Sequence, residues 1–268
     1  MGGYRRVEEP LSDGWTESAQ AWLASIGDDG DYGRKFVLDA PMLARVKRQD
    51  FKTALDVGCG EGRFCRMLQT AGISTVGIDP TAALVERARQ LDPTGDYRIA
   101  RAETLDVPSA SFDLVVSYLS LIDIADLALA ASKMSGALRP GGMLLIANLT
   151  SFNTAGMPEG WNTDSDGQRR FCIDHYLEAR PVWVSWHGIR VQNWYRPLSA
   201  YMTAFLECGL ELRHFDEPAP VWWRPRGRRA LSKSAVLRDH GVAKTERHLT
   251  ARSLAAKCRS HKARRKTC

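Results

Sequence analysis

Three glycines and two acids at fixed spacing are the residues of this 268-residue chain that could hold a charged small molecule. Gly58, Gly60 and Gly62 follow an apolar run that contains Asp56, and a helix-like segment follows them. Glycine permits positive φ and leaves no Cβ between a loop and a ligand, while the first amides of the next helix can bind an anionic group. The spacing therefore predicts a strand, a tight turn and a helix, shaped for a nucleotide-like ligand.

A second apolar run ends in Asp79 and Pro80, about twenty residues after the glycines. In a doubly wound fold, the acid at this strand end grips ribose hydroxyls, so the two strand ends would border one crevice. A dinucleotide-binding fingerprint would also need glycine at the position of Arg63, and here the third glycine comes one residue early.

The run from Asp56 to Gly62, an acid followed by Gly-x-Gly-x-Gly, resembles the first motif of the class I S-adenosylmethionine (SAM)-dependent methyltransferases. An Arg-Pro-Gly-Gly turn at 139–142, before a predicted strand, is similar to a second signature of that family. The resemblance covers roughly residues 15–218. It implies SAM as the cofactor and an α/β, Rossmann-like doubly wound fold whose mostly parallel sheet has helices on both faces.

The resemblance also implies the cofactor contacts. The glycine loop would seat the methionine end of SAM, and the acid after the second strand would bind its ribose. The position that usually holds an adenine-binding acid carries Arg101, so the backbone of Ala102 and the side chain of Glu103 are the expected substitutes. The expected cofactor-binding residues are Tyr32, Arg34, Asp56, Gly58, Cys59, Gly60, Gly62, Asp79, Pro80, Ala102, Glu103, Ser117 and Tyr118.

Residues 11–48 are expected to form a helical lid with a glycine and aspartate break. Trp15 and Trp22 recur at helical spacing, and the simplest interpretation is that both are core aromatics. In the resembling enzymes the corresponding region closes over the cofactor, so Tyr32 and Arg34 are expected near its methionine end.

Residues 150–195 are an insertion, longer than the few residues that normally join a strand to the next helix. Strand-type residues on both sides of His187-Gly188 predict a β-hairpin that caps the crevice and supplies an aromatic substrate wall. Alternatively, these aromatic residues only hold the hairpin to the core. A further strand is expected at 210–215, whereas a seventh strand is doubtful because its candidates, 221–223 and 234–237, are short.

Methyl transfer requires mainly a positioned nucleophile, because the cofactor already carries the electrophile. A phenol or amine acceptor would still gain from a base, and His175 or His187 could provide it, since imidazole titrates near neutrality. Tyr195 stands where small-molecule members of the family often have a histidine. If that histidine serves as a base in those members, its replacement here leaves the base unidentified. The candidate catalytic residues are therefore His175, His187 and Tyr195. The six cysteines have no Cys-x-x-Cys spacing, so no metal site is expected.

The charge of the chain divides into an acidic body and a basic tail. Residues 221–268 carry 15 Lys and Arg against 2 acids, or +13, which leaves 22 against 29, or −7, for residues 1–220. The body is expected to be the methyltransferase domain. The tail has few large apolar residues and is predicted to be disordered or loosely attached.

The leading interpretation is a SAM-dependent methyltransferase acting on a small molecule. The basic tail leaves RNA or ribosome modification open, because clustered cations bind phosphates. A degenerate, non-catalytic SAM-binding protein is a third possibility. Neither a membrane-length apolar run nor a signal-peptide pattern is found, so a cytoplasmic location without a membrane partner is expected.

Overall fold

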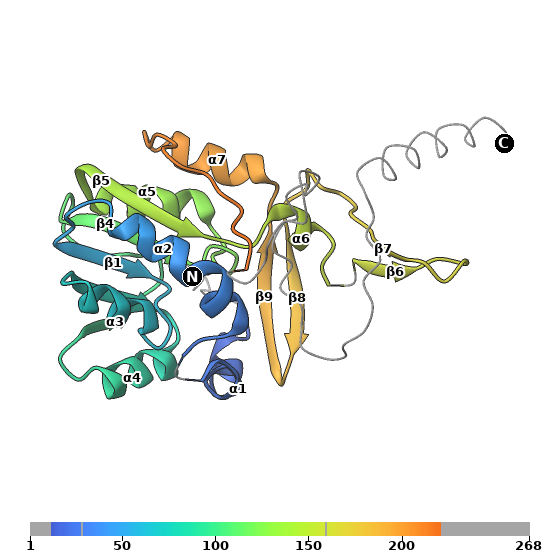
Figure 1. Cartoon of the computed structure of the whole chain (residues 1–268), viewed down its shortest axis with the longest axis horizontal. Helices are drawn as coiled ribbons and strands as arrows, with labels where there is room; N and C mark the ends of the chain where they lie inside the picture. The colour runs from blue at the N-terminus through green and yellow to red at the C-terminus, as the bar shows by residue number, and fades with distance from the viewer. Residues whose placement is uncertain (1–11, 28, 159, 221–268) are drawn as a thin grey trace, which may run out of the picture.

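The computed structural model describes residues 12–27, 29–158 and 160–220, which are built around a five-stranded parallel sheet (Figure 1). The strands lie in the order β3-β2-β1-β4-β5. Their bounds are β1 Thr53–Val57, β2 Ser74–Asp79, β3 Asp96–Ile99, β4 Phe112–Tyr118 and β5 Leu138–Ala147. β2 and β3 follow β1 on one side of it, and β4 and β5 lie on its other side. The direction in which strands are added therefore reverses between β1 and β4, which is the topological switch point of a doubly wound sheet. The predicted doubly wound fold is confirmed.

Helices cover both faces of the sheet. On one face α5 (Leu127–Ala137) packs on β4 and β5, in one apolar cluster with residues of β1 and β2, and α7 (Leu198–Leu206) lies beside it. On the other face α2 (Asp39–Val46) and α3 (Arg63–Thr70) pack against β1 and β4. The helix between β2 and β3, α4 (Ala82–Leu91), packs against both of these strands.

The sequence of β1 reflects this burial on both sides. Leu55 and Val57 pack in the cluster with α5, whereas Ala54 packs in the cluster with α2 and α3. Successive side chains of a strand point to opposite faces, so a strand covered on both faces is apolar throughout. Asp56 interrupts that pattern although it is only 1% exposed, which marks it as a residue with a role other than packing.

The N-terminal segment and a β-hairpin lie at the end of the sheet toward which the arrows of β1 and β5 point (Figure 1). The segment contains α1 (Trp15–Ile26) and the π-helical turn η1 (Arg34–Leu38). The hairpin pairs β8 (Arg180–Trp186) with β9 (Ile189–Tyr195). Its two turn residues, His187-Gly188, both have positive φ, as a two-residue hairpin turn requires. The predicted helices and hairpin are both confirmed.

A second, shorter hairpin in the insertion was not predicted. After α6 (Ser151–Ala155), β6 (Trp161–Thr163) pairs with β7 (Arg169–Phe171). Figure 1 shows this hairpin pointing away from the sheet. With only three residues in each strand, it offers too short an alternation of apolar and polar residues to be recognised from the sequence.

The strand expected at 210–215 is wrong, because this segment has no regular structure. Leu210 packs against the core, but Leu212 and Phe215 are 59% and 56% exposed, so a strand here would bury little. Within the described ranges, no strand pairs with the outer edge of β5. The basic tail and both candidate seventh-strand segments lie outside the described residues. No helix in the described part is long and apolar enough to cross a bilayer.

Candidate functional site

The carboxyl ends of β1, β2 and β4 open into a cavity of about 680 Å³. The N-terminal segment and the β8–β9 hairpin complete its wall. A volume of this order is typical of a site for a cofactor or other small molecule. The predicted residues that line it are Tyr32, Arg34, Asp56, Gly58, Cys59, Gly60, Asp79, Pro80, Ala102, Glu103, Tyr118 and His187.

The glycine loop after β1 is held by backbone hydrogen bonds to the tip of β2. The amides of Gly58 and Cys59 both donate to the carbonyl of Ile78, at 2.8 and 2.9 Å. Gly58 and Gly60 have φ values of 77° and 56°, in the left-handed region that favours glycine. A Cβ added at Gly60 would meet no atom within 4 Å, so the loop presents bare backbone to the cavity.

Asp79 fixes this loop from the end of β2. Its Oδ2 accepts the amide of Gly60 at 3.0 Å, and its Oδ1 accepts the amide of Thr81 at 2.8 Å. Burial raises the pKa of Asp79, while these two amides oppose the shift. Each carboxylate oxygen keeps a second acceptor site, so the group can also accept hydroxyls from a ligand.

Asp56 contributes a buried carboxyl group with spare hydrogen-bonding capacity. Its Oδ2 faces the Cys65 thiol at 3.5 Å, whereas its Oδ1 is buried without a hydrogen-bond partner among the described residues. Burial raises its pKa to about 7. A buried unsatisfied carboxyl oxygen on a cavity wall is suited to a cationic ligand group, and the methionine end of SAM carries an ammonium.

The N-terminal segment is tied to the glycine loop and to β4 through Asp39. Its carboxylate accepts two hydrogen bonds from Arg63, at 3.0 and 2.5 Å, and one from the Tyr118 hydroxyl at 2.8 Å. The Arg34 guanidinium lies over the rings of Trp22 and Tyr118, with its carbon 5.1 and 5.7 Å from their centroids. These contacts place a cation and two aromatic faces at the cavity wall.

The β8–β9 hairpin is anchored to the loop that follows β4. The buried guanidinium of Arg196 donates to the carbonyls of Leu121, Ile124 and Ala125, at 3.3, 2.6 and 2.8 Å. The amide of Trp194 donates to the carbonyl of Ile122 at 2.5 Å. The hairpin thus positions a loop of the cavity as well as covering it.

Two of the three catalytic candidates, His175 and Tyr195, do not line the cavity. His175 is exposed, and its Nδ1 lies 3.1 Å from a carboxylate oxygen of Glu178. Tyr195 is only 1% exposed, and its hydroxyl donates to the carbonyl of Tyr176. In contrast, the turn of the hairpin brings His187 to the cavity wall.

Two of the residues expected to contact the cofactor, Ser117 and Gly62, do not line the cavity. The hydroxyl of Ser117 is buried and lies 2.7 Å from the hydroxyl of Ser120, which lines the cavity in its place. Gly62 begins α3 in the left-handed conformation and packs against the ring of Tyr97. Both residues support the site rather than face it.

Sequence reasoning missed several cavity residues. Asp123 and Asn193 face each other in the cavity. Trp15 and Trp22 of α1 pack against the apolar cluster of the hairpin, as expected of core aromatics, and they also line the cavity. Asp123 could have been found, because it closely follows the end of β4, and ligands of parallel sheets bind at the carboxyl ends of strands. Asn193 lies inside a strand, where nothing in the sequence separates it from a surface residue.

Comparison with known proteins agrees with this geometry. Residues 55–146 match the family model described as a methyltransferase domain. The chain is 31% identical over 128 residues to malonyl-[acyl-carrier protein] O-methyltransferase of Yersinia pestis, covering 48% of this chain and 47% of that protein. It is 33% identical over 99 residues to ubiquinone biosynthesis O-methyltransferase of Chelativorans, covering 35% of this chain and 39% of that protein.

A solved structure extends the similarity beyond the matched domain. The SAM-dependent methyltransferase from Mesorhizobium loti is 29% identical, with a TM-score of 0.63, covering 72% of this chain and 88% of that one. The chain spans about half the length of the curated relatives it matches. Residues 55–146 are therefore a methyltransferase domain, and the glycine loop and strand order around it are those of the class I SAM-dependent methyltransferases.

Proposed function

We propose that this protein transfers a methyl group from SAM to a small-molecule acceptor held between the glycine loop and the β8–β9 hairpin. The observation that carries the proposal is one cavity that reaches from the tips of β1 and β2 to the hairpin. Such a cavity can hold a donor and an acceptor side by side and exclude water from both. The relatives named as O-methyltransferases support oxygen as the accepting atom.

In this proposal, different residues of the cavity bind different parts of the cofactor. Asp79 binds the ribose hydroxyls, Asp56 receives the ammonium of the methionine end, and Arg34 faces its carboxylate. Ala102 and Glu103 border the adenine. When bound, SAM supplies an electrophilic methyl group on a sulfonium, so the protein needs only to hold donor and acceptor in line.

Asp79→Ala is expected to weaken SAM binding by roughly tenfold or more. The loss corresponds to one or two charge-assisted hydrogen bonds of about 1.5 to 3 kcal/mol each. Isothermal titration calorimetry with SAM measures it, and thermal unfolding of the same variant shows whether the fold is kept. Asp50→Ala is the matched control, because Asp50 is exposed and pairs with the exposed Lys52. Unchanged affinity in Asp79→Ala would remove Asp79 from the site.

A methyl-transfer assay separates an enzyme from a non-catalytic SAM-binding protein. The assay offers SAM with a panel of phenols, aliphatic alcohols and carboxylic acid thioesters, and detects S-adenosylhomocysteine. Tight SAM binding without turnover on the panel would count against catalysis on these acceptor classes, and absence of SAM binding would reject the proposed function as a whole.

A further inference from the structure

Asp123 lies on the cavity wall, in the loop between β4 and α5. Its side chain is partly exposed to the cavity, and its amide donates to the carbonyl of Ser120 at 3.0 Å. Ser120 is bound in turn to the tip of β1, because its hydroxyl donates to the carbonyl of Val57 at 2.6 Å. The turn that carries Asp123 is therefore fixed to the strand that opens into the glycine loop.

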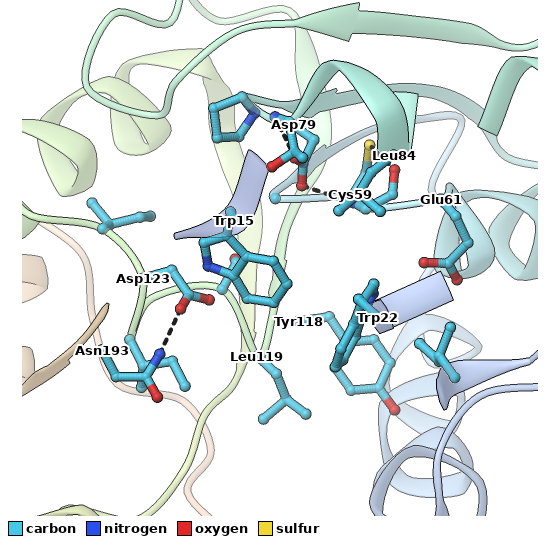
Figure 2. A pocket seen from close by; sticks show the side chains of 18 of the residues that line it. Trp15, Trp22, Cys59, Glu61, Asp79, Leu84, Tyr118, Leu119, Asp123 and Asn193 are labelled. Carbon is cyan, nitrogen blue, oxygen red and sulfur yellow. Dashed lines mark hydrogen bonds between the residues drawn. The ribbon is translucent and has the colours of Figure 1, made fainter. Parts of the chain in front are cut away.

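The β8–β9 hairpin fixes the carboxyl group from the opposite side. Asn193 is 7% exposed, and its Nδ2 donates to Oδ1 of Asp123 at 2.7 Å. Arg196 binds the carbonyls on both sides of Asp123, as described above. Figure 2 shows the Asp123 and Asn193 side chains joined by this hydrogen bond, with the indole nitrogen of Trp15 turned toward the same carboxyl group. Oδ1 is thus held by an amide, whereas no hydrogen bond reaches Oδ2 from the described residues.

Part of the wall of the same cavity is apolar. Leu149, Met157, Val184 and Trp186 line the cavity along with Asp123. Such a wall accepts an aromatic or aliphatic body, and it leaves the acid and its amide partner to recognise one polar group. A carboxyl group on such a wall contributes little to packing, so its position in the cavity indicates contact with a ligand.

The surroundings of Asp123 favour the protonated form of its carboxyl group. Burial raises the pKa of Asp123 to about 8, with the charges of Asp79 and Asp13 acting in the same direction and the nearby Trp15 indole and the hydrogen bond from Asn193 opposing it. Other charged or titratable groups line the same cavity, among them Arg101 and Glu103 after β3 and His187 in the hairpin turn, and the guanidinium of Arg196 lies behind the loop.

We propose that Asp123 is the general base of this enzyme, and that the acceptor is a small molecule with an apolar or aromatic body and one hydroxyl group. This inference rests on the proposed function. A bond forms between the acceptor oxygen and the methyl carbon, and the bond from that carbon to the cofactor sulfur breaks with its electron pair left on sulfur. The hydroxyl proton passes to the Asp123 carboxylate and then to solvent.

Binding of the methyl donor prepares the base. SAM and S-adenosylhomocysteine share the ammonium, carboxylate, ribose and adenine, but only SAM has the positive charge on sulfur. A cation close to a carboxyl group lowers its pKa by about 1 to 3 units. In this arrangement Asp123 faces the transfer centre, so SAM binding lowers its pKa and releases its proton, whereas S-adenosylhomocysteine binding does not.

Calorimetry in two buffers of different ionisation enthalpy measures this proton release at pH 7. We expect wild-type protein to release about 0.4 to 0.9 proton more on binding SAM than on binding S-adenosylhomocysteine, the change expected when a group of pKa near 8 falls by one to three units. The difference should vanish in Asp123→Asn, which keeps an oxygen for Asn193, and persist in Asp50→Asn. An equal difference in wild type and Asp123→Asn would overturn the inference.

Turnover on a hydroxyl acceptor from the same panel gives the second readout. With Asp123→Asn, kcat should fall by about 10²-fold or more, in the range of general base catalysis, with little change in the KM for the acceptor. The wild-type rate should rise with pH to a plateau, and the variant should lose that rise. Retention of the rate within threefold would reject Asp123 as the base.

The two arms separate failure of this inference from failure of the proposed function. Absence of SAM binding in wild type rejects the proposed function. If wild type binds SAM but Asp123→Asn shows the same difference in proton release, only the assignment of Asp123 as the base is rejected. Turnover of carboxylate acceptors alone, with a rate that falls as pH rises, rejects the hydroxyl acceptor class while leaving methyl transfer intact.

Discussion

Replacing Gly58 with alanine is expected to destabilise the protein by about 3 kcal/mol or more. Part of the cost, about 1 to 2 kcal/mol, comes from forcing an L-residue into the left-handed region at a φ of 77°. A further 1 to 3 kcal/mol or so comes from overpacking, because the new Cβ would lie 2.3 Å from Cβ of Ser120. Ser120 cannot yield freely, since its hydroxyl is bound to the carbonyl of Val57.

Gly60→Ala is the matched control, two residues along the same loop. It carries the same backbone cost, but its Cβ would meet no atom within 4 Å. We expect the melting temperature to fall by roughly 6 to 12 °C for Gly58→Ala and by only a few degrees for Gly60→Ala. SAM affinity should fall in the folded Gly60→Ala protein, because the methyl group enters the cavity. Equal melting temperatures for the two variants would contradict the packing described for Gly58.

The stability of the ligand-free protein is expected to fall as pH rises from about 5 to 7.5. Asp56 and Asp123 have pKa values of about 7 and about 8 in the folded protein, and the value for an unfolded chain is about 3.9. The folded state therefore holds more protons than the unfolded state in this window. Each group then contributes stability that is complete below about pH 4 and is lost as pH rises, at up to about 1.4 kcal/mol per pH unit.

Urea unfolding at half-unit pH steps measures this slope. We expect the free energy of unfolding to fall by at least about 2 kcal/mol across the window. Asp123→Asn should flatten the slope, and Asp50→Asn should leave it unchanged. Below pH 4 the trend should reverse, because hydrogen bonds from Lys52, Thr53 and Arg139 lower the pKa of Asp113 to about 2. A free energy of unfolding that rises between pH 5 and 7.5 would contradict the burial of these acids.

The centre of the fold could be predicted because its signals are local. The apolar strands, the three glycines and the acid after β2 are read within short windows, and the parallel sheet covered on both faces makes those strands apolar throughout. The hairpin was equally predictable, since His187-Gly188 sits between two runs of strand-forming residues. In each case the residues that determine the element are next to one another in the chain.

Two catalytic candidates lie away from the cavity because their positions depend on contacts distant in sequence. His175 and Tyr195 have chemically suitable side chains, but the packing of the insertion turns one to solvent and buries the other against Tyr176. Asp123 and Asn193 are 70 residues apart, and only the docking of β9 on the loop after β4 brings them together. The segment at 210–215 has several apolar residues, but Leu212 and Phe215 remain more than half exposed, so pairing it as a strand would bury little apolar surface.

A crystal structure of the protein with S-adenosylhomocysteine bound tests most directly whether the tips of β1 and β2 hold the cofactor. We expect its ribose at Asp79, its methionine end at Asp56 and the glycine loop, and its sulfur facing the part of the cavity lined by Asp123. The compound bound outside this cavity, or in it with the sulfur turned away from the β8–β9 hairpin, would contradict that arrangement.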